Sequence, residues 1–172
     1  DVEFSALDAT RADEDFLIAA VKEAEASGAT VITVCDDAGV STPDNIASLV
    51  AKVKQAVSVP VWVKVSDRVN MAVASAFSAV KAAADGLKCA MVGRATLLTG
   101  ELSDAVNTCG SQIDAEIRLD RTKIHASIDD MTSNISHDTY ENENTVSEKK
   151  NILLDSDSSL SQVAQAARVL GY

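Results

Sequence analysis

The chain has 172 residues, of which 47% are hydrophobic and 24% are charged, so it is long enough for one globular domain with a buried core. Its 26 acidic and 15 basic residues give a formal net charge of -11, which argues against a nucleic-acid backbone as partner because phosphate binding needs clustered Lys and Arg. No apolar run is long enough to span a bilayer and no signal peptide is recognisable, so the sequence predicts no membrane association.

The first elements along the chain predict a strand, a helix and a second strand. The segment DVEFSA (1–6) predicts the first strand. The segment 13–28 predicts a helix that ends at a capping Gly28. Its apolar residues share one helical face, which comprises Phe16, Leu17, Ala20, Val21 and Ala24. The β-branched segment ATVITVCD (29–36) does not alternate and predicts a strand covered on both faces.

The pattern then repeats. The segment 42–57 predicts a helix with Thr42 as N-cap and Pro43 at its first position. Further along, VPVWVKVS (59–66) predicts a third strand, and residues 68–86 predict a helix that ends at Gly86. LKCAMVG (87–93) predicts a weaker fourth strand, and residues 99–110 predict a short helix. The fold class is therefore α/β, with parallel βα repeats whose strands start roughly 27 to 30 residues apart. Four such repeats form either a small open sheet or half of a (β/α)8 barrel.

The chain changes character after residue 110. Segment 112–135 predicts an amphipathic helix with Ile124, Ile128 and Met131 on one face. A polar run without periodicity predicts a loop or flexible linker near 136–150. Segment 157–172 predicts a final helix whose apolar positions are Leu160, Val163, Ala166, Ala167 and Leu170. We therefore expect a region of βα repeats over 1–110 and a small helical segment over 111–172.

The three cysteines, Cys35, Cys89 and Cys109, have no paired spacing. An odd number of thiols in a chain without a signal peptide predicts a cytoplasmic protein in which they are small core residues. His125 lies on a mostly polar segment and His137 in the polar run, so we expect both on the solvated surface.

Several of these segments resemble one family of (β/α)8 barrels, which includes isopropylmalate synthase, homocitrate synthase and HMG-CoA lyase (the HMGL-like, or DRE-TIM metallolyase, family). VEFSALDATRAD looks like the family's fifth strand and its turn, GATVITVCDDAGVSTPDNI is similar to the sixth unit, and VNMAVASAFSAVKAAADG resembles the seventh helix. The resemblance implies the C-terminal half of a TIM-type barrel followed by part of a post-barrel segment. It also implies aldol or Claisen chemistry, in which a divalent metal polarises an α-keto acid and acetyl-CoA is often the nucleophile.

The positions that hold the metal in this family carry other residues here. The family's His-x-His falls on Lys64 and Ser66, the Asn-Asp that follows falls on Asp67 and Arg68, and an Asn at the end of strand eight falls near Met91. One remaining oxygen ligand from elsewhere could not hold a catalytic divalent ion. We therefore expect no family-type metal site and no cofactor from this chain.

Barrel chemistry occurs at the C-terminal ends of the strands, and this rule selects the candidate site residues. They are Asp8, Arg11, Asp36, Asp37, Lys64 and Ser66. Lys64 could occupy the former metal position and neutralise Asp36 or Asp37. It could then bind a carboxylate, or form a Schiff base if its pKa is lowered. The simpler alternative is a structural ion pair in an emptied site.

Arg11 could contact an anion, with Asp8 in the pocket wall. The alternative is local: Asp8 and Asp13 serve as turn and capping residues, and Arg11 pairs with a neighbour. Asp37 stands where the resemblance places a Thr, and a carboxylate there would repel an α-keto acid.

The sequence thus predicts an isopropylmalate or homocitrate synthase-like protein that lacks the metal-dependent acyl transfer, as a fragment or as a non-catalytic or regulatory subunit. Because it does not begin with Met, we expect a fragment or a processed chain. The alternative is a subunit of an active condensing transferase whose missing half another chain supplies. Open sheet edges make a second copy, or a chain carrying the N-terminal half-barrel, the expected partner, together with a small carboxylate as ligand.

Overall fold

The computed structural model describes the backbone of residues 1–143 and the side chains of residues 1–134. Contacts divide the chain into two compact units, Asp1–Thr132 and a second that starts at Ser133. The helix predicted over 157–172 lies outside the described residues. Among the helices that are described, none combines the length and apolar character needed to cross a membrane.

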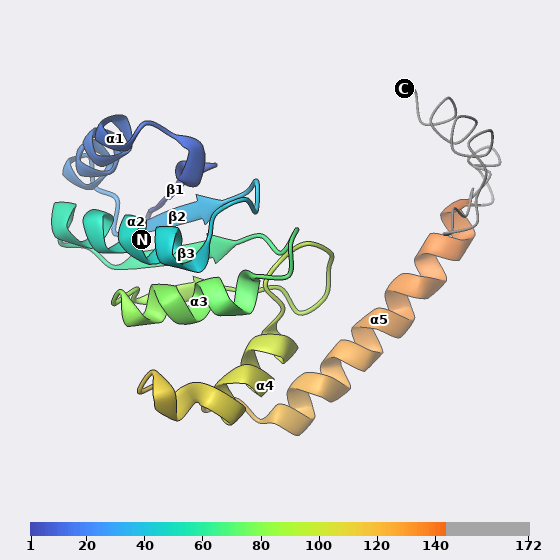
Figure 1. Ribbon diagram of the computed structural model, residues 1–172. Coiled ribbons are helices and arrows are strands. Elements are labelled where there is room, and N and C mark those ends of the chain that lie inside the picture. The colour runs from blue at the N-terminus through green and yellow to red at the C-terminus, as the bar shows by residue number, and fades with distance from the viewer. Residues whose placement is uncertain (144–172) are drawn as a thin grey trace, which may run out of the picture. The chain divides into compact units, whose positions relative to one another are not determined.

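Four parallel strands form one sheet in the order of the sequence (Figure 1). They are β1 (Glu3–Ala6), β2 (Val31–Asp36), β3 (Val61–Val65) and β4 (Gly86–Lys88). Each strand pairs in parallel with the next one along the chain. A doubly wound sheet would reverse its strand order at a switch point, whereas a barrel adds each strand on the same side. The uninterrupted order confirms the predicted half of a barrel.

Three helices pack side by side along the sheet, in the order of the strands (Figure 1). They are α1 (Glu14–Ala26), α2 (Pro43–Ala56) and α3 (Ala72–Lys81). Helix α2 begins as predicted, because the Thr42 side chain accepts a hydrogen bond from the Asn45 N–H at 3.4 Å and Pro43 follows it. Asp13 caps α1 in the same way, through the Phe16 N–H at 2.9 Å.

Two apolar clusters fill the space between the helices and one face of the sheet. In the first, Leu17 and Val21 of α1 meet Ile32 and Val34 of β2. In the second, side chains of α2 and α3 meet β3 and the loop after β4; it includes Ile46, Val50, Val63, Val65, Ala76, Ala79 and Leu97. Phe16 was predicted to lie on the apolar face of α1, and this is wrong because its side chain is 70% exposed. The buried stripe begins at Leu17, and Phe16 lies about 100° away from it around the helix.

Helix α3 is shorter than predicted because the chain must turn into β4. It ends at Lys81 rather than Gly86, and Ala83 adopts a left-handed backbone with φ 64°. Gly86 instead belongs to β4 and lies beneath the Trp62 ring, where an added Cβ would come within 2.8 Å of that ring. Gly86, which the sequence predicts as the end of a helix, is thus required by the packing of Trp62 against β4.

The fourth strand is shorter than predicted, whereas the short helix predicted over 99–110 is confirmed. β4 has three residues only, because Ala90 leaves the sheet and its N–H donates to Leu97 O at 3.0 Å. After β4, the described part of the chain forms α4 (Thr99–Cys109), η2 (Gly110–Gln112) and α5 (Arg121–Glu143).

Helix α5 begins nine residues later than predicted and continues through 136–143, so the linker prediction is wrong there. No Gly or Pro interrupts the segment. Of its predicted apolar face, Ile124 is buried, Ile128 is half-buried and Met131 is 42% exposed.

Candidate functional site

The ends of β1, β2 and β3 meet at the side chain of Asp37. Lys64 Nζ donates to Asp37 Oδ1 at 2.8 Å, and the backbone N–H of Asp8 donates to Asp37 Oδ2 at 2.9 Å. The Ser66 hydroxyl donates to the Asp37 carbonyl at 3.2 Å. Asp8, Asp37, Lys64 and Ser66 therefore form one connected group, and Arg11 joins it through Asp8, so it holds five of the six predicted site residues.

The pair of Lys64 and Asp37 is a stable ion pair rather than an activated amine. The hydrogen bond from Lys64 lowers the pKa of Asp37, and the bond to Asp37 raises the pKa of Lys64. Schiff-base chemistry requires the opposite shift in the pKa of a lysine. The side chain of Lys64 is also 44% exposed, so burial does not destabilise its charged form.

Asp36 does not belong to this group, so of the two partners predicted for Lys64 the structure selects Asp37. Asp36 is only 3% exposed and accepts a hydrogen bond from the Thr10 hydroxyl at 2.7 Å. In the sheet it lies opposite Val65, whereas Cys35 lies opposite Lys64. Because successive strand residues point to opposite faces, Asp36 faces the helices and Lys64 faces away from them.

Asp8 and Arg11 pair with each other, as the local alternative predicted. Arg11 Nε donates to Asp8 Oδ1 at 3.0 Å, and a second bond joins Arg11 Nη2 to Asp8 Oδ2. The Arg11 guanidinium lowers the pKa of Asp8. Asp8 itself adopts φ 54°, and the short helix η1 (Ala9–Arg11) follows it. This turn directs the Asp8 N–H toward Asp37.

An open hollow of about 410 Å³ lies over these side chains. It is lined by Asp8, Arg11, Asp37, Ala38, Val40 and Arg68. Both carboxylates already have a cationic partner. Arg68 is exposed, and among the described residues no ion pair to it is seen. The hollow therefore carries one positive charge more than its acidic groups neutralise.

Arg68 was not among the predicted site residues, although the rule of strand ends could have found it. It lies three residues after the end of β3, beside Ser66. Gly39, in the loop after β2, positions the loop after β3 that carries Arg68. Gly39 has φ 62°, and a Cβ added to it would lie 3.1 Å from Ser66 Cβ and 3.2 Å from Arg68 Cβ. The glycine thus lets the β2 and β3 loops pack closely enough for Arg68 to reach the hollow.

The residues present do not fit the divalent ion that the resemblance implies. Such an ion needs several oxygen or imidazole ligands. Both Asp37 oxygens are engaged, and one of them contacts an ammonium group that would repel a cation. Across the part of the chain that the structure describes, no three His, Cys, Asp or Glu side chains gather closely enough to hold a metal.

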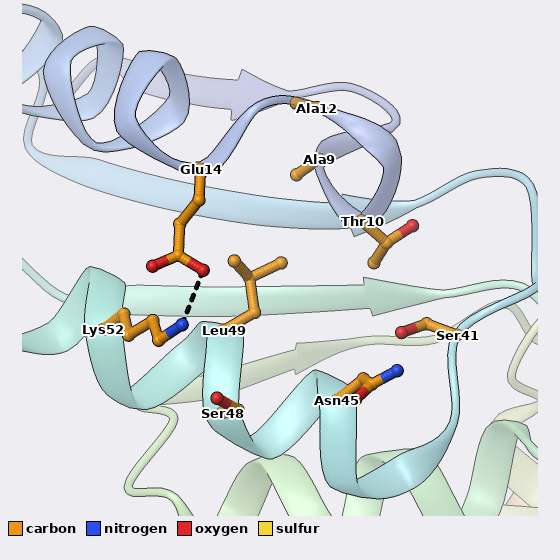
Figure 2. A pocket seen from close by; sticks show the side chains of 9 residues that line it. All are labelled: Ala9, Thr10, Ala12, Glu14, Ser41, Asn45, Ser48, Leu49 and Lys52. Atoms are coloured by element: carbon orange, nitrogen blue, oxygen red, sulfur yellow. Dashed lines mark hydrogen bonds and ion pairs between the residues drawn. The ribbon is translucent and has the colours of Figure 1, made fainter.

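A second pocket, of about 220 Å³, lies between η1 and α2 (Figure 2). It is polar, with Thr10, Ser41, Asn45 and Ser48 among its lining residues. Figure 2 shows Lys52 and Glu14 pointing toward one another, and their charged atoms lie 2.5 Å apart. Because Glu14 already neutralises Lys52, this pocket is a weaker candidate for an anion-binding site than the hollow at Arg68.

The remaining predicted residues fall outside both pockets. Cys35 is buried, as predicted, but Cys89 is exposed. His125 is not simply solvated, because its Nε2 lies 3.2 Å from Asp104 Oδ1 on α4. The side chain of His137 lies outside the described residues.

The model of the HMGL-like family matches residues 1–101. A probable 2-isopropylmalate synthase of Methanopyrus kandleri is 45% identical over 84 residues, which cover 49% of this chain and 17% of that protein. The 2-isopropylmalate synthase of Xylella fastidiosa is 40% identical over 97 residues, 54% of this chain and 19% of that protein. A putative (R)-citramalate synthase of Archaeoglobus fulgidus is 39% identical over 84 residues, 49% of this chain and 17% of that protein. The chain thus spans less than a fifth of each relative.

Solved structures show the same fold. The carboxyl transferase domain of Rhizobium etli pyruvate carboxylase with pyruvate superimposes with a TM-score of 0.62 at 22% identity, over 74% of this chain and 23% of that chain. Another structure of this domain gives a TM-score of 0.59 at 26% identity, over 69% of this chain and 20% of that chain. The matched part of each is a section of a longer chain.

Proposed function

The chain belongs to the HMGL-like family, and on that premise we propose that it is the C-terminal half of an isopropylmalate synthase-like barrel that binds a small carboxylate without a divalent metal. One observation carries the proposal. An ammonium–carboxylate pair, Lys64 with Asp37, stands at the strand ends where the resemblance places the metal, and Arg68 beside it has no ion pair among the described residues.

The chemistry of the hollow favours a small anion with a short apolar part. A guanidinium binds a carboxylate through two parallel hydrogen bonds, and Arg68 is the group free to do so. Ala38 and Val40 line the same hollow and offer apolar contact to the rest of the molecule. Asp37 does not repel such a ligand, because Lys64 neutralises the charge of the Asp37 carboxylate.

We propose that this chain binds and orients a carboxylate but does not catalyse acyl transfer alone. A condensation needs a group that polarises the keto carbonyl, and Lys64 is committed to Asp37. A second candidate is a subunit of an active condensing transferase. The relatives named as synthases favour it. The segment that they share with this chain is less than a fifth of their length, so most of a synthase lies outside the shared segment. The groups missing here would then come from the other half of the barrel.

Titration with pyruvate, followed by NMR or calorimetry, tests the proposal. We expect binding by protein treated with EDTA, no gain on adding Mn²⁺, and at least a tenfold weaker affinity in Arg68→Gln. Arg118→Gln is the matched control, because Arg118 is 90% exposed and pairs with Glu116 on the surface. Binding that requires Mn²⁺ would contradict the metal-free site. Unchanged binding by Arg68→Gln would place the carboxylate elsewhere.

A further inference from the structure

The first turns of α5 are held against α4 by a small apolar contact. Among residues 121–134, whose side chains the structure describes, Ile124, His125 and Ile128 are shielded and the others are exposed. Their spacing places these three residues on one side of the helix. A Cβ added to Gly100 of α4 would lie 2.9 Å from Ile128 Cδ1 and 3.6 Å from His125 Cε1. This side of α5 therefore rests directly on the backbone of α4.

Beside this apolar contact, Asp104 of α4 meets Arg121 and His125 of α5, and we call these three residues the Asp104 cluster. Arg121 Nε lies 2.6 Å from Asp104 Oδ1, and His125 Nε2 lies 3.2 Å from the same oxygen. Arg121 and His125 are one turn apart on their helix, so both reach the same carboxylate. Hydrogen bonds from His125 and Arg121 lower the pKa of Asp104. The carboxylate therefore remains ionised between the two helices.

The two partners of Asp104 respond differently to pH. A guanidinium such as that of Arg121 keeps its charge throughout the pH range in which proteins fold. An imidazole gains or loses its proton between about pH 5 and pH 8. A hydrogen bond to a carboxylate is roughly twice as strong when its donor is charged. Protonated His125 therefore adds a second charge-assisted bond between α4 and α5, whereas neutral His125 leaves Arg121 as the one cation on Asp104.

The other acids on these two helices near His125 act in the same direction as Asp104. Glu101, one turn before Asp104 on α4, is exposed, and no ion pair to it is seen within the described residues. Asp129, one turn after His125 on α5, is likewise exposed and, in that part of the chain, without an ion pair. A neighbouring negative charge favours the protonated imidazole. Neither acid therefore opposes the effect of Asp104 on His125.

We propose that the Asp104 cluster is a pH-sensitive attachment of α5 to α4, tighter in mild acid than above neutrality. Two isoleucines are a small apolar contact for a helix of 23 residues, so one added charge changes the docking equilibrium measurably. Because the protonated form of His125 binds Asp104 more strongly, docking favours proton uptake and weakens as the pH rises. Helix α5 continues beyond Thr132 into the second compact unit, so the cluster determines how firmly this helix is held at its start. This inference is independent of carboxylate binding.

Amide hydrogen exchange of the full chain at about pH 5.5 and about pH 7.5, corrected for the intrinsic exchange rate, tests the attachment. We expect the amides of residues 125–132 to be at least threefold better protected in acid. His125→Gln keeps a neutral donor near Asp104, so it should abolish this increase. Arg121→Gln is the matched variant on the same carboxylate. It should lower the protection at both pH values and retain the increase in acid.

The amides of α2 are the internal reference, because α2 contains no histidine and packs in the core of the sheet. Wild-type protection of α5 that does not change with pH relative to α2 overturns the proposal. An increase in acid that survives in His125→Gln overturns it too, because the proton would then bind another group, such as His137, the second histidine of the chain. If His125→Gln also lowers the protection of α2, the same comparison with His125→Asn decides.

Discussion

Asp36 and Asp37 are consecutive in the chain, yet their carboxylates lie on different sides of the structure. Asp37 meets Lys64 and the N–H of Asp8 at the ends of the strands. Asp36 is buried on the helical side, where Thr10 donates to it. The two acids therefore have separate roles: one neutralises a cation at the candidate site, and the other fixes η1 to the sheet beneath it.

The ion pair of Lys64 and Asp37 contributes little to stability. In Lys64→Met we expect a loss of about 0.5 kcal/mol in the free energy of unfolding, because both partners are partly exposed. Lys54→Met is a matched control. Lys54 pairs with Asp85 at 2.7 Å, and Asp85 also keeps a backbone N–H donor, from Val61. Urea unfolding should give similar losses for both variants.

Binding should separate the same two variants. Lys64→Met leaves the Asp37 carboxylate unneutralised beside the hollow, so pyruvate affinity should fall at least threefold. Lys54→Met should leave the affinity unchanged, since Lys54 and Asp85 lie outside the hollow. If Lys64→Met folds and binds pyruvate as the wild type does, the pair is structural only.

The stability of the chain should depend on Glu3 in acid. Hydrogen bonds from Lys88, Thr33 and Ser5 lower the pKa of Glu3 from 4.5 to about 2. Because the folded-state pKa is the lower one, this contribution is fully present above pH 4.5 and is lost as the pH falls toward 2. The gap between wild type and Glu3→Gln in the free energy of unfolding should be about 1 kcal/mol at pH 6, allowing for solvent screening.

Urea unfolding of both proteins between pH 6 and pH 2 measures this gap. It should close as the pH falls. A gap that is constant across the series would show that Glu3 titrates normally in the folded chain.

Thr10 should matter more than an ordinary surface threonine. Thr10→Val keeps the shape of the side chain but removes the donor to the buried Asp36 carboxylate. Leaving a buried charged group without that hydrogen bond should cost about 2 kcal/mol. Thr108→Val is the control: Thr108 is exposed and its hydroxyl bonds a helix carbonyl, so its loss should be about 0.5 kcal/mol or less. Equal losses in urea would mean that Thr10 does not support Asp36.

Gly39 should be required for the site and not only for the turn. Gly39 and Gly28 both have positive φ, so Gly39→Ala and Gly28→Ala should each lose about 1–2 kcal/mol in stability from the backbone. An added Cβ at Gly28 meets no atom within 4 Å, whereas at Gly39 it presses on Ser66 and Arg68. Pyruvate affinity should fall in Gly39→Ala alone. A comparable fall in Gly28→Ala would point to a general loss of structure.

The local elements of this fold could be predicted from the sequence. Thr42 and Pro43 begin α2 because a cap depends on neighbours three residues away. The β-branched runs form β2 and β3, and their repetition with helices indicates a parallel sheet. The prediction that Lys64 and Ser66 stand where the resemblance places a His-x-His likewise comes from the chain alone, since it depends on sequence positions and not on geometry.

Long-range contacts decided the rest. Whether Lys64 met Asp36 or Asp37 depended on the register between β2 and β3, and one residue of shift exchanges the faces. Arg68 became a site residue because Gly39 lets a loop from another strand approach it. Glu3 and Lys88 are 85 positions apart, and only the curvature of the sheet brings them together. A sequence pattern records which side chains share a face of one element, whereas tilt, register and curvature are set by packing between elements.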